Sequence, residues 1–136
     1  MFVPLLLSIA SIQAAEGLDR FDPLVAAPGH HRVLLENNQV RVLMVTVGPG
    51  ETEPPHHHPL PSVFHIDEAQ PSTDIDYVVQ EDGSLVESGR RALPSGPPPP
   101  ALWFPPQGLH AVRNDGTGTY RAIRVELKTP GVLAVP

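Results

Sequence analysis

The sequence contains no cysteine. This absence excludes disulfide bonds, thiolate metal ligands and cysteine nucleophiles, so any metal site must be built from histidine, aspartate or glutamate. Positive charge is also scarce, because 9 Lys and Arg residues face 15 Asp and Glu residues and leave a net charge of -6. No run of basic residues concentrates a positive field, and we therefore expect no nucleic-acid partner.

Helical periodicity is the second thing that the sequence lacks. The 136 residues include 18 prolines and 11 glycines, too many chain breakers for long helices. Short runs rich in β-branched residues alternate instead with turn residues. We predict an all-β sandwich or barrel, with strands at 31–35, 40–47, 62–66, 76–81, 84–88, 101–104, 110–113 and 120–128.

The first 30 residues are expected to lie outside this domain. Residues 2–10 form an apolar stretch of signal-peptide length, too short to span a bilayer, and small residues follow near Ala14. We predict a signal peptide over 1–14, an irregular segment over 15–30 and the barrel over 31–136. The protein is then exported to the periplasm, with no membrane partner after signal removal. Because no Lys or Arg precedes the apolar stretch, a cytoplasmic protein with a buried N-terminal segment is the alternative.

Three consecutive histidines stand in a segment bracketed by prolines, so their backbone is extended. Side chains on a strand alternate between its faces, which turns His56 and His58 one way and His57 the other. Two imidazoles at this spacing can grip one ion. A further ligand must come from elsewhere, and His110 on a later predicted strand is the candidate, although spacing alone does not bring the three together.

The first of two motifs that resemble the cupin superfamily lies here. Gly50, five intervening residues, His56, one residue and His58 match the beginning of cupin motif 1. That motif usually continues with a glutamate ligand, and this chain has Ser62 and Val63 at the two places where it falls. The resemblance therefore implies a site without the glutamate.

The segment 105–114 resembles cupin motif 2, with the motif's histidine at His110 and its asparagine at Asn114. The motif's glycine is displaced by one position, since Gln107 stands in its place and Gly108 follows. We interpret Gly108 and Asn114 as turn residues.

The resemblance covers about residues 33–127 and implies a small single-domain cupin, whose fold is a double-stranded β-helix or jelly-roll barrel. It also implies one divalent transition-metal ion inside the barrel, held by His56, His58 and His110. Three neutral imidazoles suit Fe, Zn, Ni or Cu, and the sequence does not choose among them.

Some three-histidine cupins are iron-dependent dioxygenases, so the leading expectation is a metal-dependent oxygenase of this type that acts on a small organic molecule. The sequence assigns no catalytic acid or base. A non-catalytic cupin that binds a metal or a small ligand is the alternative, and an ion that only stabilises the barrel is a third. Open sheet edges favour a homodimer that shares the strand at 31–35.

Other polar and apolar residues give weaker signals. His30 and His31 are expected to face solvent or to form local hydrogen bonds, His57 and His65 to lie outside the ligand set, and Glu51 and Glu53 to be exposed charges in a proline-rich loop. The possible lining of a substrate pocket consists of Ser62, Phe64, Met44 and Trp103. Ordinary core packing, or for Ser62 the end of a turn, is the alternative.

Overall fold

A computed structural model of the chain describes residues 19–94 and 96–128. The predicted signal peptide at 1–14 lies outside the described residues. These residues form one short helix, α2 (Pro23–Ala26), and nine strands: β1 (His31–Glu36), β2 (Val40–Val47), β3 (His56–His58), β4 (Ser62–Glu68), β5 (Ser72–Val79), β6 (Leu85–Ala92), β7 (Leu102–Phe104), β8 (Gln107–Asn114) and β9 (Tyr120–Leu127). The predicted all-β fold class is confirmed.

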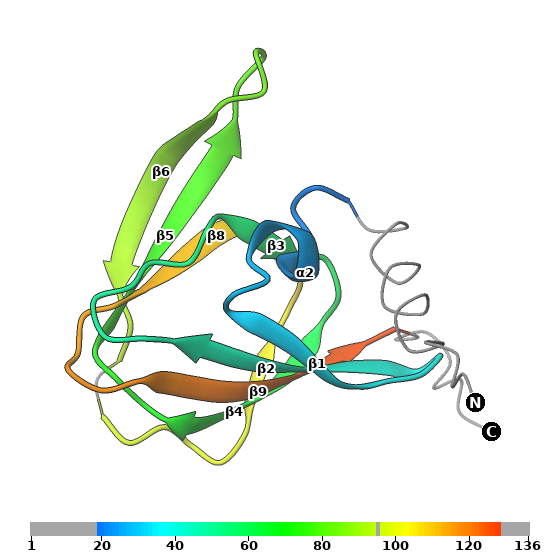
Figure 1. Ribbon diagram of the computed structural model, residues 1–136, viewed down its shortest axis with the longest axis vertical. Coiled ribbons are helices and arrows are strands. Elements are labelled where there is room, and N and C mark those ends of the chain that lie inside the picture. Colours follow the sequence, from blue (N-terminus) through cyan, green and yellow to red (C-terminus); the bar gives the residue numbers. More distant parts are fainter. Residues whose placement is uncertain (1–18, 95, 129–136) are drawn as a thin grey trace, which may run out of the picture.

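The strands form two antiparallel sheets that face each other (Figure 1). One sheet has the strand order β1-β2-β9-β4-β7, and the other has the order β3-β8-β5-β6. The β5–β6 hairpin extends away from the body formed by the remaining strands. β1 and β3 are edge strands of different sheets, so each lies at the border of its own sheet.

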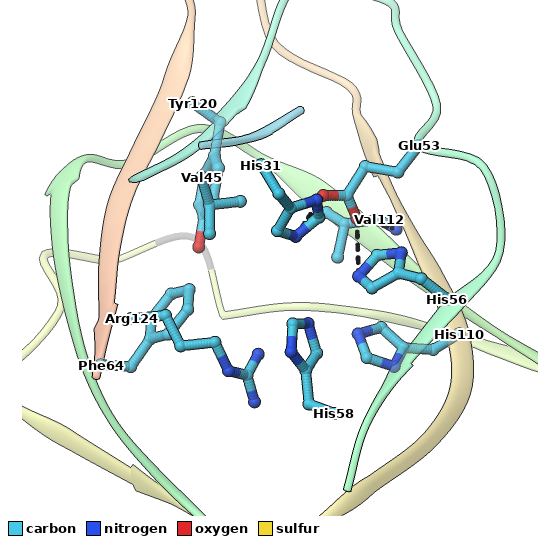
Figure 2. A pocket seen from close by; sticks show the side chains of 10 residues that line it. All are labelled: His31, Val45, Glu53, His56, His58, Phe64, His110, Val112, Tyr120 and Arg124. Carbon is cyan, nitrogen blue, oxygen red and sulfur yellow. Dashed lines mark hydrogen bonds and ion pairs between the residues drawn. The ribbon is translucent and has the colours of Figure 1, made fainter. Parts of the chain in front are cut away.

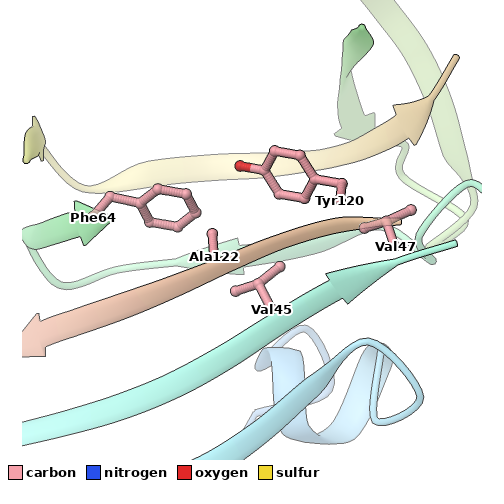
Figure 3. Packing of buried hydrophobic residues seen from close by; sticks show 5 residues of the cluster. All are labelled: Val45, Val47, Phe64, Tyr120 and Ala122. Atoms are coloured by element: carbon pink, nitrogen blue, oxygen red, sulfur yellow. The ribbon is translucent and has the colours of Figure 1, made fainter. Parts of the chain in front are cut away.

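The apolar core lies on the inner face of the larger sheet (Figure 3). Alternate residues of β2 are buried, and its register with β9 sets Val45 opposite Ala122 and Val47 opposite Tyr120. Phe64 of β4 packs against them. Burying a side chain of this size contributes roughly 1.5–3 kcal/mol to the free energy of unfolding, so these few residues supply much of the stability of the core.

Local turn chemistry fixes the predicted β1–β2 hairpin and the end of β2. The Asn37 carboxamide oxygen accepts hydrogen bonds from the backbone N–H groups of Gln39 and Val40 at 2.8 and 2.9 Å. This is an Asx-type turn, which replaces backbone pairing at the loop. Gly50 has a φ of 74°, a left-handed conformation in which glycine avoids the strain that a Cβ would bring.

The segment before the barrel is not wholly irregular, which corrects the prediction for 15–30. Asp22 caps α2 by accepting a hydrogen bond from the Leu24 N–H at 2.9 Å, and Pro23 occupies the first helical position. The helix packs against β1 and β3. A four-residue helix is too short to show a 3.6-residue period, which is why the sequence pattern misses it. None of the helices in the described part of the chain is both long and apolar enough to cross a membrane.

β1 exposes three consecutive apolar side chains. Val33, Leu34 and Leu35 are 37%, 41% and 55% exposed, and β1 has a paired neighbour on one side only. An edge strand with exposed apolar side chains suits pairing with another chain. The homodimer stays a prediction.

Candidate metal centre

Two adjacent strands bring the three predicted ligands to one wall of the barrel. In β3 the side chains of His56 and His58 are buried and that of His57 is half-buried, as the alternation along a strand requires. β8 runs antiparallel to β3 and sets His110 directly opposite His56. A bulge then puts Gln107, rather than Gly108, opposite His58, so Gly108 lies in a strand and not in the predicted turn.

His31 joins these residues from the other sheet. It is the first residue of β1 and only 4% exposed, with its ring centroid 4.5 Å from that of His56. The sequence-based expectation of local hydrogen bonding holds, since the His31 Nδ1 lies 3.2 Å from the Ala27 carbonyl oxygen. The expectation that His31 faces solvent is wrong. His31 is buried because α2 packs against both β1 and β3. No local sequence pattern predicts this contact.

The histidines form a cluster that could hold a metal ion. The ligand nitrogens of His31, His56 and His58 all lie within 4.8 Å of one another. The His110 ring centroid is 4.8 Å from that of His56 and 5.6 Å from that of His58. The prediction of a buried histidine site is confirmed in this form, while the assignment of His110 as a ligand stays a prediction.

Each of the four rings turns its Nδ1 toward an acceptor. The His58 Nδ1 lies 2.9 Å from the Glu126 Oε1. The other three rings use backbone carbonyl oxygens: His31 with Ala27, His56 with Pro54 and His110 with Gly108. Because a carbonyl or carboxylate oxygen only accepts, each Nδ1 carries the proton and each Nε2 keeps a free lone pair. This is the tautomer that a metal ion binds.

Burial keeps these rings neutral. Loss of solvation lowers the pKa of His31 to about 4 and that of His56 to about 2, with neighbouring histidines adding to the effect. Burial also lowers the pKa of His110, and burial together with the Arg124 charge holds the pKa of His58 well below its usual range. All four are therefore unprotonated at Nε2 near pH 7, so an ion would not have to displace protons from them.

Glu53 is the second residue that the sequence places wrongly. Its side chain is buried rather than exposed, with Oε1 at 3.7 Å from the His31 Nε2 and Oε2 at 4.0 Å from the His56 Nε2. The Val112 N–H donates to Oε2 at 3.0 Å, and burial raises the pKa of Glu53 to about 7. The carboxylate that the motif lacks after His58 is thus present at the site from a position before His56.

A small cavity of about 40 Å³ lies among these groups (Figure 2). Figure 2 shows the four imidazoles and the Arg124 guanidinium turned toward it from different strands. Its walls are formed by His31, Val45, Glu53, His56, His58, Phe64, His110, Val112, Tyr120 and Arg124. A volume of this size has room for an ion and one or two small groups.

Solved structures with a similar fold include cupins. A cupin domain from Bordetella pertussis Tohama I is 21% identical, and the match covers 72% of this chain and 91% of that chain with a TM-score of 0.51. An RmlC-like cupin with a double-stranded β-helix fold from Methanocaldococcus jannaschii is 13% identical, with coverage of 71% and 77% and a TM-score of 0.47. No family model and no curated protein matches the sequence.

This chain has the cupin fold. The predicted resemblance and the double-stranded β-helix are confirmed. The asparagine of the second motif has a structural role, because the Asn114 side chain donates to the carbonyl oxygens of Val47 and Gly118 and accepts from the Gly116 N–H. It organises the turn between β8 and β9, as the sequence indicates.

The four residues predicted to line a substrate pocket lie in different places. Phe64 lines the histidine cavity. Ser62 is fully buried beneath it, and its hydroxyl accepts a hydrogen bond from the Arg124 Nε. Met44 and Trp103 do not line the cavity. Met44 lies on the opposite face of β2 from Val45, and Trp103 pairs with Val63 on the outer face of its sheet and is 60% exposed.

A buried carboxylate orients one of the clustered histidines. Glu126 accepts hydrogen bonds at both oxygens, from the His58 Nδ1 at 2.9 Å and from the Arg41 Nε at 2.6 Å. Arg41 in turn donates to Asp22, the residue that caps α2. The position of His58 is therefore fixed by a chain of charged groups that no motif contains.

Exchange of Glu126 for glutamine tests this support. We expect Glu126→Gln to weaken metal binding by about 10- to 100-fold, because the amide has one acceptor oxygen where His58 and Arg41 together need two. Competition with a chromogenic chelator would measure the change. Glu68→Gln, at an exposed carboxylate of β4, is the control, and equal affinities in the two variants would contradict the role of Glu126.

Proposed function

We propose that this cupin binds one divalent transition-metal ion among its buried histidines and uses it in an oxygenase-type reaction on a small organic molecule. The observation that carries the proposal is the histidine cluster, in which the ligand nitrogens of His31, His56 and His58 lie within 4.8 Å of one another and are neutral. Imidazole nitrogens suit Fe, Zn, Ni and Cu.

The side chains present fit such an ion. The cupin motifs select His56, His58 and His110 as ligands, whereas the nitrogen distances select His31, His56 and His58. The two sets therefore differ only in the third ligand. A bound transition ion with open positions would supply a Lewis acid and, in the case of iron, a place for molecular oxygen. Val45, Phe64 and Val112 exclude bulk water from the cavity around it.

A non-catalytic cupin is the second candidate, and the size of the cavity favours it. The cavity among the histidines, of about 40 Å³, holds by itself an ion and its water but not a complete organic substrate. In that case, the protein would carry or sense a metal ion without turnover.

Metal analysis of the untagged protein tests the proposal. We expect close to one ion per chain, either as purified or after treatment with a chelator and reloading with Fe, Zn, Ni or Cu. Oxygen uptake by the iron-loaded form with small organic acids would support the oxygenase, and tight metal binding without any uptake would support the second candidate. A protein that takes up none of these metals would contradict both.

A further inference from the structure

Arg124 is a buried cation without an anionic partner among the described residues. It is 4% exposed, its Nε donates to the Ser62 hydroxyl at 3.0 Å, and its Nη2 donates to the Gln107 carboxamide. Burial lowers the pKa of Arg124 to about 10, so the guanidinium stays charged at pH 7. A desolvated charge without a counter-ion is costly, and an anion brought by a ligand would remove that cost.

The Glu126 and Glu53 carboxylates act on Arg124 through their charge, but neither forms an ion pair with it among the described residues. Glu126 binds His58 and Arg41, and Glu53 accepts from the Val112 N–H. The Arg124 Nη1 has no hydrogen-bond partner within the described part of the chain, and the cavity is the space beside it. The same is true of the Tyr120 hydroxyl, on a residue that is 8% exposed (Figure 2). Two residues that line one small cavity therefore each carry a donor without a hydrogen-bond partner in the described part of the chain.

An apolar pocket adjoins this cavity. Its volume is about 220 Å³, and Phe64 and Tyr120 line both spaces. The remaining walls are mostly apolar and include Ile66, Leu93, Leu102 and Phe104, together with the proline loop at 97–99. A dry cavity of about 150 Å³ can hold benzene, so this pocket accepts a group of the size of one aromatic ring. Arg124 lies at the border, with its Cζ 5.4 Å from the Phe64 ring centroid and 5.9 Å from that of Phe104.

We infer that the two spaces form one binding site for a small organic acid with an apolar body. The carboxylate lies beside the histidines and accepts hydrogen bonds from Arg124 and Tyr120, and the body fills the pocket between β4, β7 and the proline loop. Donors that the fold already holds in place, one of them charged, give a charged acceptor an advantage over a neutral one. The inference rests on the proposed function only in placing the reacting end of the molecule beside the metal site.

Titration calorimetry with three probes, which measures how tightly each one binds, tests the inference. Phenylacetate has both the ring and the carboxylate, phenylacetamide has the same shape without the charge, and acetate lacks the ring. We expect phenylacetate to bind at least about tenfold more tightly than either of the others. Equal affinity for phenylacetate and phenylacetamide, or no binding of phenylacetate at millimolar concentration, would overturn the inference.

Arg124→Met should abolish the preference for phenylacetate over phenylacetamide. Arg121→Met is the matched control, because Arg121 lies on the same strand and points outward, and it should keep the preference. If Arg124→Met does not fold, Arg124→Lys retains the charge but loses the fork geometry, and we expect it to reduce the preference. A preference that survives these changes would contradict the role of Arg124.

The metal-loaded and chelator-treated forms separate this inference from the proposed function. A preference for the carboxylate in both forms, lost in Arg124→Met, supports the inference even for a protein that holds no metal. A preference that disappears with the metal and persists in Arg124→Met assigns the carboxylate to the ion and overturns the role of Arg124.

Discussion

Replacement of His56 or His58 by alanine is expected to abolish metal binding. Both histidines belong to the cluster whose ligand nitrogens lie within 4.8 Å of one another, and either change removes a neutral donor from its centre. Removing a residue that merely orients a ligand costs about 10- to 100-fold in affinity, so loss of the ligand itself should cost more. Metal content per chain, measured by elemental analysis after dialysis, would show the loss.

His57→Ala is the matched control. His57 stands between the two ligands on the opposite face of β3, with its Nε2 2.9 Å from an Asp19 carboxylate oxygen. It should retain the full metal content. If this variant loses as much metal as His56→Ala, the metal is bound by the histidine run as a flexible surface segment, and the buried site is contradicted.

Two further variants decide the third ligand. The sequence selects His110, which lies opposite His56 across the β3–β8 pair, whereas the group whose ligand nitrogens lie within 4.8 Å of one another contains His31. Loss of metal in His110→Ala alone supports the motif-derived set. Loss in His31→Ala alone supports the set that spans both sheets, and loss in both indicates a centre with four histidines.

The predictable features of this protein are those with a local cause. The parity of His56 and His58 follows from the two-residue period of an extended segment, and prolines on both sides enforce that backbone. The turn at Asn37 follows from a side chain that satisfies its own loop. Neither feature needs knowledge of the rest of the chain.

The errors concern residues whose surroundings come from distant segments. His31 and Glu53 carry no local sign of burial, because each is covered only when the sheets close around the cavity. Trp103 faces outward because the β4–β7 register sets it opposite Val63, while Phe64 faces inward. A shift of that register by one residue would reverse the face, so the sequence alone cannot choose. Arg41 lies within an otherwise apolar strand, a pattern that indicates a buried ion pair. The sequence-based prediction did not include this ion pair.

Removal of the Arg41 guanidinium is expected to cause the largest loss of stability. Its Nε lies 2.6 Å from a Glu126 oxygen, its Nη1 and Nη2 lie 3.2 and 3.0 Å from the Asp22 carboxylate, and it is 5% exposed. Burial disfavours the charge, but these bonds outweigh it and raise the pKa of Arg41. Arg41→Met would leave two buried carboxylates without their cationic partner, which costs about 3–5 kcal/mol of unfolding free energy.

Arg121→Met separates burial from ion pairing as the cause. Arg121 also pairs with two carboxylates, those of Asp67 and Glu68, but its side chain is 44% exposed and water can replace the lost partner. Urea unfolding of both variants, with the metal removed by a chelator, would compare them without the contribution of metal binding. We expect a large loss for Arg41→Met and a change close to measurement error for Arg121→Met. A loss for Arg41→Met as small as that for Arg121→Met would mean that Glu126 and Asp22 find other partners, and the buried network would then not be what fixes His58.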